Sequence, residues 1–291
     1  MVQGHVLLIG GAEDKIRERI ILARFVRLAG GPGARIAVIS TASSLGAAAG
    51  QLYQRVFGEL GAEQVTAIHA QSRAEANDDG PAGQLSVVAT ASGIFLTGGN
   101  QLRLAATIGG TRLAQAVLEA HAGGATVAGT SAGASAMSSH MVAFGASGAS
   151  PRQRMAQVAA GLGVLPGVIV DQHFQQRNRL GRLLSIIAQN PSLLGIGIDE
   201  DTAGDVGPDG VLEVVGRRSV TIVDGADSET DAWEVAAHRP IMISDVRLHS
   251  LPAGYRFDLY RRVRMPGPIL RAVEDLGVQA GSERPGSAAS G

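Results

Sequence analysis

Five consecutive residues, Gly129-Thr130-Ser131-Ala132-Gly133, form the pattern G-x-S-x-G directly after a short apolar run at 125–128. In a strand–turn–helix unit this pattern places the serine at a sharp bend, with its hydroxyl clear of the sheet and beside helix amides that favour negative charge. The pattern therefore predicts a serine hydrolase with Ser131 as the nucleophile. It is short, and the chain holds 40 glycines, so the motif alone favours catalysis and a chance strand–helix turn about equally.

An activated serine needs a base within hydrogen-bond reach and an acid that orients this base. Of the seven histidines, His173 is best placed, because it follows the apolar run 168–170 inside a dense polar cluster; a surface histidine at a strand end explains its position alone equally well. The next apolar run ends at Asp199, Glu200 and Asp201. Alternation along a strand directs either Glu200 or the two aspartates toward the site, unless all three belong to a solvated loop.

A second glycine-containing turn, residues 97–101 (Thr-Gly-Gly-Asn-Gln), also follows an apolar run. The amide of Gly99 could bind an oxyanion beside the amide of Ala132, and the alternative is a tight turn before a helix. Residues 10–15 (Gly-Gly-Ala-Glu-Asp-Lys) lack the G-x-G-x-x-G spacing, which excludes a dinucleotide site there.

Three arginines follow the candidate base, at Arg177, Arg179 and Arg182. On a helix the last two share a face and Arg177 points elsewhere. Arginine binds carboxylates through two parallel hydrogen bonds, so these residues indicate a substrate with free carboxylates. The alternative is helix-surface charge.

Composition narrows the function classes. The 291 residues carry a net charge of −1 and only 3% aromatic residues, which gives no electrostatic or stacking basis for binding nucleic acid or an anionic membrane. The chain has no cysteine, so disulfides and thiolate chemistry are excluded. We find no signal peptide, no apolar run long enough to span a bilayer and no convergent metal ligands, so we expect a cytoplasmic protein without a metal or cofactor.

Short apolar runs alternate with helix-like stretches as far as Asp201, which predicts an α/β fold with a mostly parallel central sheet and helices on both faces. After about residue 205, apolar runs separated by turn residues predict additional antiparallel strands. Residues 71–83 are predicted to form a surface loop. We expect one domain over residues 1–276 and a disordered, low-complexity tail over residues 277–291.

These stretches together resemble the cyanophycinases, serine peptidases related to aspartyl dipeptidase with a class I glutamine amidotransferase-like fold. The resemblance extends from the first apolar run to about Ala203, and its most specific part is the Asp-Gln-His-Phe block with its arginines. The matching residues are Gly10 to Lys15, Thr97 to Gln101, Gly129 to Ala134, Asp171 to Phe174 with Arg177, Arg179 and Arg182, and Gly197 to Ala203.

The resemblance implies a serine-type exopeptidase that hydrolyses cyanophycin, a poly-aspartate whose β-carboxyls carry arginine, to β-Asp-Arg dipeptides. It implies a homodimer that needs no metal. It assigns Ser131 as nucleophile, His173 as general base and Glu200 as the orienting acid, with Gly99 and Ala132 as the oxyanion hole. The implied substrate-binding residues are Gln101, Asp171, Gln172, Arg177, Arg179 and Arg182, with Asp171 as a partner for the substrate's arginine.

Three alternatives remain. A related peptidase could act on other β-aspartyl or isoaspartyl peptides. An α/β-hydrolase esterase would pair Ser131 with a late histidine, His238 or His249. A non-catalytic binding or dimerisation module would retain the fold with an unreactive serine.

Overall fold

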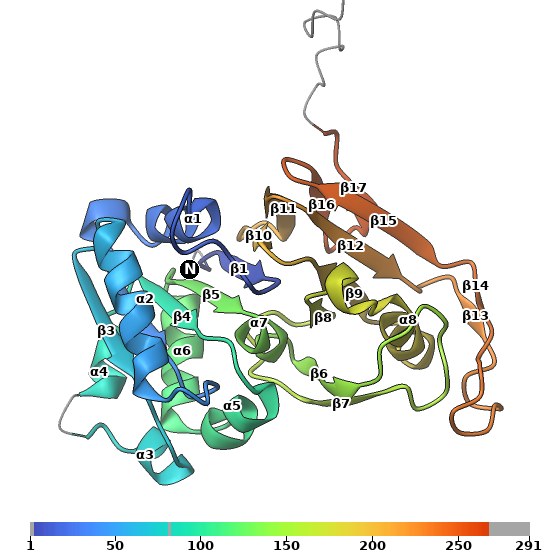
Figure 1. Cartoon of the computed structure of the whole chain (residues 1–291), viewed down its shortest axis with the longest axis horizontal. Helices are drawn as coiled ribbons and strands as arrows, with labels where there is room; N and C mark the ends of the chain where they lie inside the picture. Colours follow the sequence, from blue (N-terminus) through green and yellow to red (C-terminus); the bar gives the residue numbers. More distant parts are fainter. Residues whose placement is uncertain (1–2, 81–82, 268–291) are drawn as a thin grey trace, which may run out of the picture.

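The computed structural model describes residues 3–80 and 83–267. Its largest sheet has nine strands in the order β17-β16-β11-β10-β1-β5-β4-β2-β3 (Figure 1). The five strands from β1 to β3 in this order are parallel, and the remaining four continue the sheet antiparallel. The strands are β1 (Val6–Ile9), β2 (Arg35–Ile39), β3 (Gln64–Ile68), β4 (Gly93–Leu96), β5 (Thr126–Thr130), β10 (Thr202–Val206), β11 (Val211–Gly216), β16 (Arg256–Asp258) and β17 (Val263–Arg264).

Helices cover both faces of the parallel part, because its strands are apolar throughout and expose a hydrophobic surface on each side. In β1, Leu7 packs into the core that includes α1 and α2, and Leu8 packs into the opposite core with α5 and α6. The helices are α1 (Ile20–Leu28), α2 (Ala47–Glu59), α3 (Arg73–Asn77), α4 (Gln84–Ala89), α5 (Gln101–Ile108), α6 (Arg112–Ala122), α7 (Ala132–Ala136) and α8 (Leu180–Gln189), with short 3-10 turns at Gly31–Gly33 and Gln175–Arg177. The predicted fold class is confirmed, as are the antiparallel strands after residue 205.

A second sheet holds two of the strands that the sequence places beside the candidate site. Its order is β15-β12-β9-β8, and β8 and β9 are parallel to each other. Helix α8 packs on this sheet through Leu183, Ile186 and Ile187. The strands are β8 (Val168–Gln172), β9 (Leu194–Ile198), β12 (Ser219–Asp224) and β15 (Arg247–Pro252).

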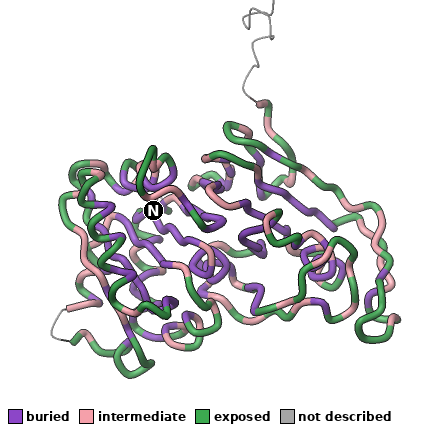
Figure 2. The backbone as a smooth tube through the Cα atoms, in the orientation of Figure 1, coloured by how far each residue is buried: buried purple, intermediate pink, exposed green. Residues whose placement is uncertain are grey.

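Two antiparallel strand pairs lie outside the nine-stranded and four-stranded sheets. Figure 2 shows the buried interior running through the sheet strands, whereas long stretches of these segments are exposed. The pairs are β6 (His140–Gly145) with β7 (Ala156–Ala160), and β13 (Glu229–Thr230) with β14 (Ile243–Ser244).

Within the described residues of the predicted surface loop, 71–80 and 83, the structure differs from a loop at one place. A short helix, α3, forms there because the Ser72 hydroxyl accepts a hydrogen bond from the Glu75 amide and caps the first turn. The predicted tail, residues 277–291, lies outside the described residues.

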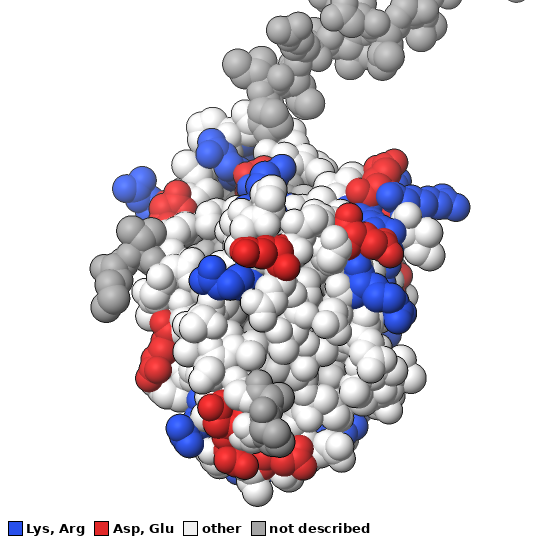
Figure 3. Space-filling model, turned by 90° about the vertical axis from the view of Figure 1, so that its left-hand side faces the viewer, with Lys and Arg blue, Asp and Glu red and all other residues white. Residues whose placement is uncertain are grey.

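Surface charge is mixed on the side of the molecule that carries α2, α3 and α4. Figure 3 shows basic and acidic side chains next to one another there, around a central area of uncharged residues. No helix within residues 3–80 and 83–267 combines the length and the apolar character needed to cross a membrane.

Candidate active site

Ser131 lies at the bend between β5 and α7. Its backbone has φ +52°, a left-handed conformation that is uncommon for a residue other than glycine. The Ser131 amide donates to the Ile9 carbonyl of the neighbouring strand at 2.9 Å, which holds the bend against the end of β1. The G-x-S-x-G pattern therefore forms a strand–turn–helix unit with its serine in a strained position.

Three side chains from separate strand ends form a hydrogen-bonded chain. Ser131 Oγ lies 2.9 Å from Nε2 of His173, and His173 Nδ1 lies 2.7 Å from Oε1 of Glu200. His173 directly follows β8, and Glu200 lies in the turn between β9 and β10. With the proton on Nδ1, the ring donates to Glu200 and accepts the Ser131 hydroxyl at Nε2, which is the arrangement that a general base requires.

The three consecutive acids after β9 have different contacts. Only Glu200 contacts the imidazole. Asp199 accepts from the Gln175 amide and the Ser219 hydroxyl, both at 3.0 Å, and Asp201 accepts from the Asp14 amide at 2.9 Å. The two aspartates thus stabilise neighbouring loops, whereas Glu200 faces the histidine.

The segment that follows β1 joins all three parts of this site. The carbonyls of Ile9, Gly10 and Gly11 accept from the amides of Ser131, His173 and Asp201 respectively, each at 2.9 Å. Gly11 has φ +99°, and a Cβ built at this position would lie 2.4 Å from Cε1 of the His173 ring. A glycine is therefore required there, for its backbone conformation and for the space that the imidazole occupies.

Glu13 is a buried carboxylate that sequence reasoning missed as a site residue. Its oxygens accept from the Thr130 hydroxyl at 2.6 Å and the Tyr53 hydroxyl at 2.5 Å, and Lys15 Nζ lies 2.8 Å away. Thr130 directly precedes Ser131, so Glu13 fixes the residue before the bend. The available signal was an acid four residues after an apolar strand, in a segment that the sequence analysis gives no role beyond the family resemblance once a dinucleotide site is excluded.

The turn at residues 97–101 leads into α5, whose first turn is capped by the Asn100 side chain. A Cβ built on Gly98 would lie 3.4 Å from Cβ of Ser131, whereas Gly99 packs against the backbone of Ala42. The Gln101 amide group donates to the carbonyls of Val142 and Ala143 at 3.0 and 2.8 Å, which connects α5 to β6. Gly98 therefore lies beside the serine, and the Gln101 amide nitrogen is already bonded within the protein.

Asp171 is buried and paired with two arginines of the protein. It is 1% exposed, Arg182 donates to both of its oxygens, and Arg179 Nη1 lies 3.3 Å from Oδ1. Two guanidinium groups of the protein therefore already engage this buried carboxylate. Arg182, the partner of Asp171 in this ion pair, is 4% exposed and also donates to the Gly145 carbonyl. Asp171 and Arg182 thus form a buried ion pair, and their predicted roles in substrate binding remain predictions.

Arg179 and Gln172 belong to the same buried cluster. Gln172 Oε1 accepts from Arg179 Nη1 at 2.7 Å, and Arg179 Nε is buried without a hydrogen-bond partner among the described residues. Burial lowers the pKa of Arg179 to about 10, although the negative charge of Asp171 opposes this shift. Two guanidinium groups, those of Arg179 and Arg182, thus contact a single carboxylate, and this cluster retains an excess of positive charge.

Arg177 is the exposed arginine of the three. Burial lowers the pKa of His173 below its ordinary value of 6.5. The hydrogen bond that the ring donates to Glu200 opposes this shift, and the positive charge of Arg177 adds to it. A lowered pKa keeps His173 neutral, and therefore able to accept a proton, at neutral pH.

The two late histidines of the esterase hypothesis lie elsewhere. His249 is on β15, with its ring centroid 5.1 Å from that of Phe257. His238 lines a cavity with residues of the β6–β7 hairpin. Within the part of the chain that the structure describes, Ser131 has its imidazole partner in His173.

Comparison with known proteins shows a family and close relatives. The model of peptidase family S51 matches residues 6–212. The chain is 45% identical to a cyanophycinase of Trichormus variabilis over 90% of this chain and 87% of that protein. It is 42% identical to a cyanophycinase of Geminocystis herdmanii, over 92% and 98%. A crystal structure of a peptidase from an acI-B1 Actinobacterium has the same fold, with a TM-score of 0.61 and 23% identity over 88% of this chain and 97% of that one.

Replacing the exposed arginine beside the site should change the ionisation of His173. We predict that Arg177→Gln raises the pKa of His173, because the substitution removes a positive charge that disfavours the imidazolium. An NMR titration of the imidazole resonances measures this pKa directly. Arg55→Gln, an exposed arginine on α2, is the matched control and should leave it unchanged. An unchanged or lowered pKa in Arg177→Gln would contradict the electrostatic coupling.

Removing the buried carboxylate should destabilise the protein. Glu13→Ala leaves the hydroxyls of Thr130 and Tyr53 without their acceptor, which we expect to cost about 1–3 kcal/mol in the free energy of unfolding. Glu18→Ala is the control, because Glu18 is exposed and pairs only with exposed Arg217, and it should cost less than about 1 kcal/mol. Urea unfolding measures both, and equal values would show that the buried network does not stabilise the bend.

Proposed function

The chain belongs to peptidase family S51, and from this premise we propose that it is a serine-type cyanophycinase that releases β-Asp-Arg dipeptides from cyanophycin. The observation that carries the proposal is the hydrogen-bonded chain Ser131–His173–Glu200 in a protein whose relatives are named cyanophycinases. The chain is a peptidase, and the catalytic roles below are part of the proposal.

In the first step Ser131 Oγ attacks a backbone carbonyl carbon of the poly-aspartate chain. Nε2 of His173 accepts the hydroxyl proton as the new C–O bond forms, and Glu200 stabilises the resulting imidazolium through Nδ1. The carbonyl oxygen becomes an oxyanion. The amides of Ala132 and Gly99 are the proposed donors to it, with Gly98 adjacent to the serine.

Collapse of this intermediate breaks the C–N bond, and the imidazolium gives its proton to the leaving amine. The acyl group then remains on Ser131 Oγ as an ester. Water attacks the ester carbonyl, His173 takes a proton from it, and the restored hydroxyl leaves with the proton from the ring. The sum of these steps is the hydrolysis of one amide bond, and Ser131 and His173 regain their starting states.

Positive charge beside the histidine suits this substrate. Each arginine of cyanophycin is attached through its amino group and keeps a free carboxylate. Arg177 is exposed next to His173, and the cluster of Arg179, Arg182 and Asp171 retains positive charge behind it. We propose that Arg177 pairs with a substrate carboxylate, with Arg179, Gln172 and Gln101 shaping the pocket around it.

The predicted homodimer and cytoplasmic location remain predictions. Sedimentation equilibrium of the purified chain tests the first, and fractionation of the producing cells tests the second.

Removal of the nucleophile should abolish the activity. We predict that Ser131→Ala lowers kcat for the release of β-Asp-Arg by roughly 10⁴-fold or more, and that His173→Ala does the same, because each removes an essential part of one unit. Mass spectrometry of the products of purified cyanophycin measures the rate. His249→Ala is the matched histidine control and should keep the wild-type rate. Full activity in Ser131→Ala would exclude the serine mechanism, and loss of activity only in His249→Ala would favour the esterase arrangement.

A further inference from the structure

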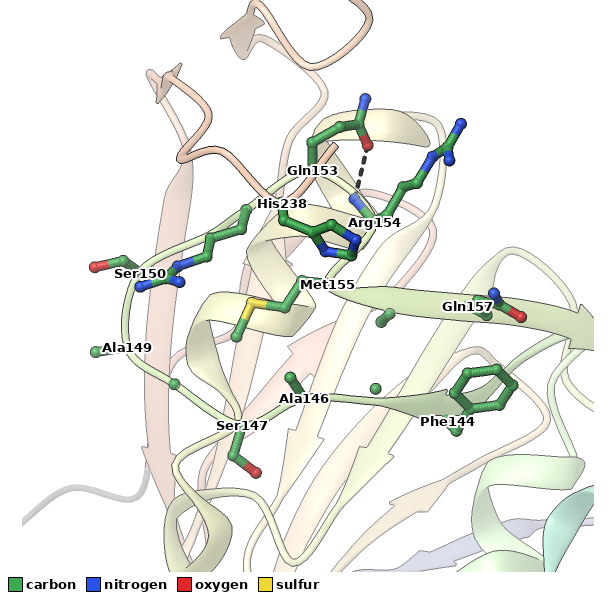
Figure 4. A pocket seen from close by; sticks show the side chains of 14 residues that line it. Phe144, Ala146, Ser147, Ala149, Ser150, Gln153, Arg154, Met155, Gln157 and His238 are labelled. Carbon is green, nitrogen blue, oxygen red and sulfur yellow. Dashed lines mark hydrogen bonds between the residues drawn. The ribbon is translucent and has the colours of Figure 1, made fainter. Parts of the chain in front are cut away.

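A cavity of about 870 Å³ lies outside the candidate active site, within the curve of the β6–β7 hairpin (Figure 4). Residues 144–150 and 152–157 line it on the hairpin side, and His238 reaches it from the segment between β13 and β14. In the close-up the His238 ring lies above Met155, while Phe144 and Gln157 lie together at one end. The cavity therefore combines two segments that are far apart in the sequence.

The cavity is lined by basic side chains and by no acidic one. Arg152, Arg154 and His238 line it, and none of the lining residues is an aspartate or a glutamate. The backbone amides of the two arginines donate to Ser185 Oγ at 2.9 Å and Gln153 Oε1 at 2.8 Å. Neither guanidinium forms an ion pair within residues 3–80 and 83–267, and both residues are exposed. Such groups are available to bind an anion.

The backbone holds two of these residues in an uncommon conformation. Arg154 has φ +57° and His238 has φ +67°. Two hydrogen bonds of 2.9 Å join their segments, from the Gln153 amide to the Arg239 carbonyl and from the His238 amide to the Gln153 carbonyl. Left-handed φ at non-glycine residues is unfavourable and is concentrated at functional positions. Both side chains line the cavity in this conformation.

The cavity is also connected to the candidate active site. Gln101 bonds to β6 directly before Phe144, and Arg182 donates to the Gly145 carbonyl. The Gly148 amide donates to the carbonyl of Asn178 at 2.7 Å, next to Arg177. One side of the cavity is thus bonded to the segment that carries the exposed arginine beside His173.

The cavity is also lined by one aromatic ring, that of Phe144. Phe144 is 55% exposed and lies at the end of the cavity that adjoins the Gln101 contact. The face of an exposed aromatic ring attracts a guanidinium group, whereas arginine and protonated histidine bind carboxylates. A repeat of cyanophycin carries one group of each kind.

We propose that this cavity is a second binding site for the polymer, which holds repeats remote from the cleaved bond. Arg152, Arg154 and His238 bind the free carboxylates of the arginine residues, and Phe144 contacts a guanidinium group. The proposal rests on the proposed function, because it takes its ligand from the same substrate. It predicts a protein that distinguishes long polymer from short peptides through a surface that does not touch the reacting atoms.

Binding to insoluble cyanophycin tests the proposal without turnover. In a Ser131→Ala background, Arg152→Gln combined with Arg154→Gln should reduce cosedimentation affinity for the granules about fivefold or more, the expected loss for two exposed arginine–carboxylate contacts. Arg154→Glu alone should reduce the affinity further than Arg154→Gln alone. Raised salt should weaken the binding of the Ser131→Ala parent more than the binding of the double variant. Arg55→Gln on α2 is the matched control. Unchanged cosedimentation of the double variant would overturn the proposal.

Kinetics separate the second site from the catalytic one. With Ser131 present, the double variant should raise KM for the polymer and leave kcat and KM unchanged for a peptide of two β-Asp-Arg repeats. Equal losses on both substrates would place the arginines in the catalytic pocket and overturn the proposal. A changed sedimentation coefficient would make the cavity a contact between copies of the chain, which also overturns it. Failure of the wild-type chain to cleave any cyanophycin would reject the proposed function instead, and granule binding would still decide whether the cavity holds the polymer.

Discussion

Three consecutive peptide carbonyls at the end of β1 determine where the candidate catalytic groups lie. Those of Ile9, Gly10 and Gly11 each bind the amide of a different strand end, and these strand ends belong to two separate sheets. The serine follows β5 of the large sheet, whereas the histidine follows β8 of the smaller one. Without this segment, nothing in the strand order of either sheet would fix the distance between the hydroxyl and the imidazole. The strand itself is immobilised because its side chains are buried in the cores on both faces.

The same hydrogen bonds explain how the protein maintains several unfavourable backbone conformations at one place. Ser131, His173 and Asp201 all have positive φ, and each amide is one of those bound by the segment after β1. Conformations of this kind persist only where the surroundings over-determine them. Glu13 adds a further constraint four residues after Ile9, because its carboxylate binds the hydroxyl next to the nucleophile from the side of the α1–α2 core. Position and strain are therefore controlled by one short stretch, Ile9 to Glu13.

Much of this arrangement could be predicted from the sequence, because apolar strands that end in polar residues bring their carboxyl ends to one region. That reasoning selected Ser131, His173 and the α/β fold, and it left the choice between Glu200 and the two flanking aspartates to the family resemblance. It could not identify the role of residues 9–11, because every residue has a carbonyl and no side chain marks those three. It also could not predict the ion pair between Asp171 and Arg182, since the partner of a buried arginine depends on how α8 packs against β8. The cavity could not be predicted from the sequence either. Arg154 and His238 lie in distant segments, and backbone hydrogen bonds bring these segments together.

The pairing of Asp171 with Arg182 and Arg179 also has an electrostatic consequence. This pairing neutralises part of the buried arginine charge. The exposed guanidinium of Arg177 therefore acts both on the pKa of His173 and on the charge of an approaching ligand. If a substrate carboxylate binds beside Arg177, as proposed, its negative charge offsets that of the guanidinium. The pKa of His173 then rises relative to the free enzyme, because one of the groups that lower it is neutralised. The imidazole would thus become a stronger base in the complex than in the free protein. With a ligand that lacks the carboxylate, the pKa of His173 would rise less and the imidazole would be a weaker base.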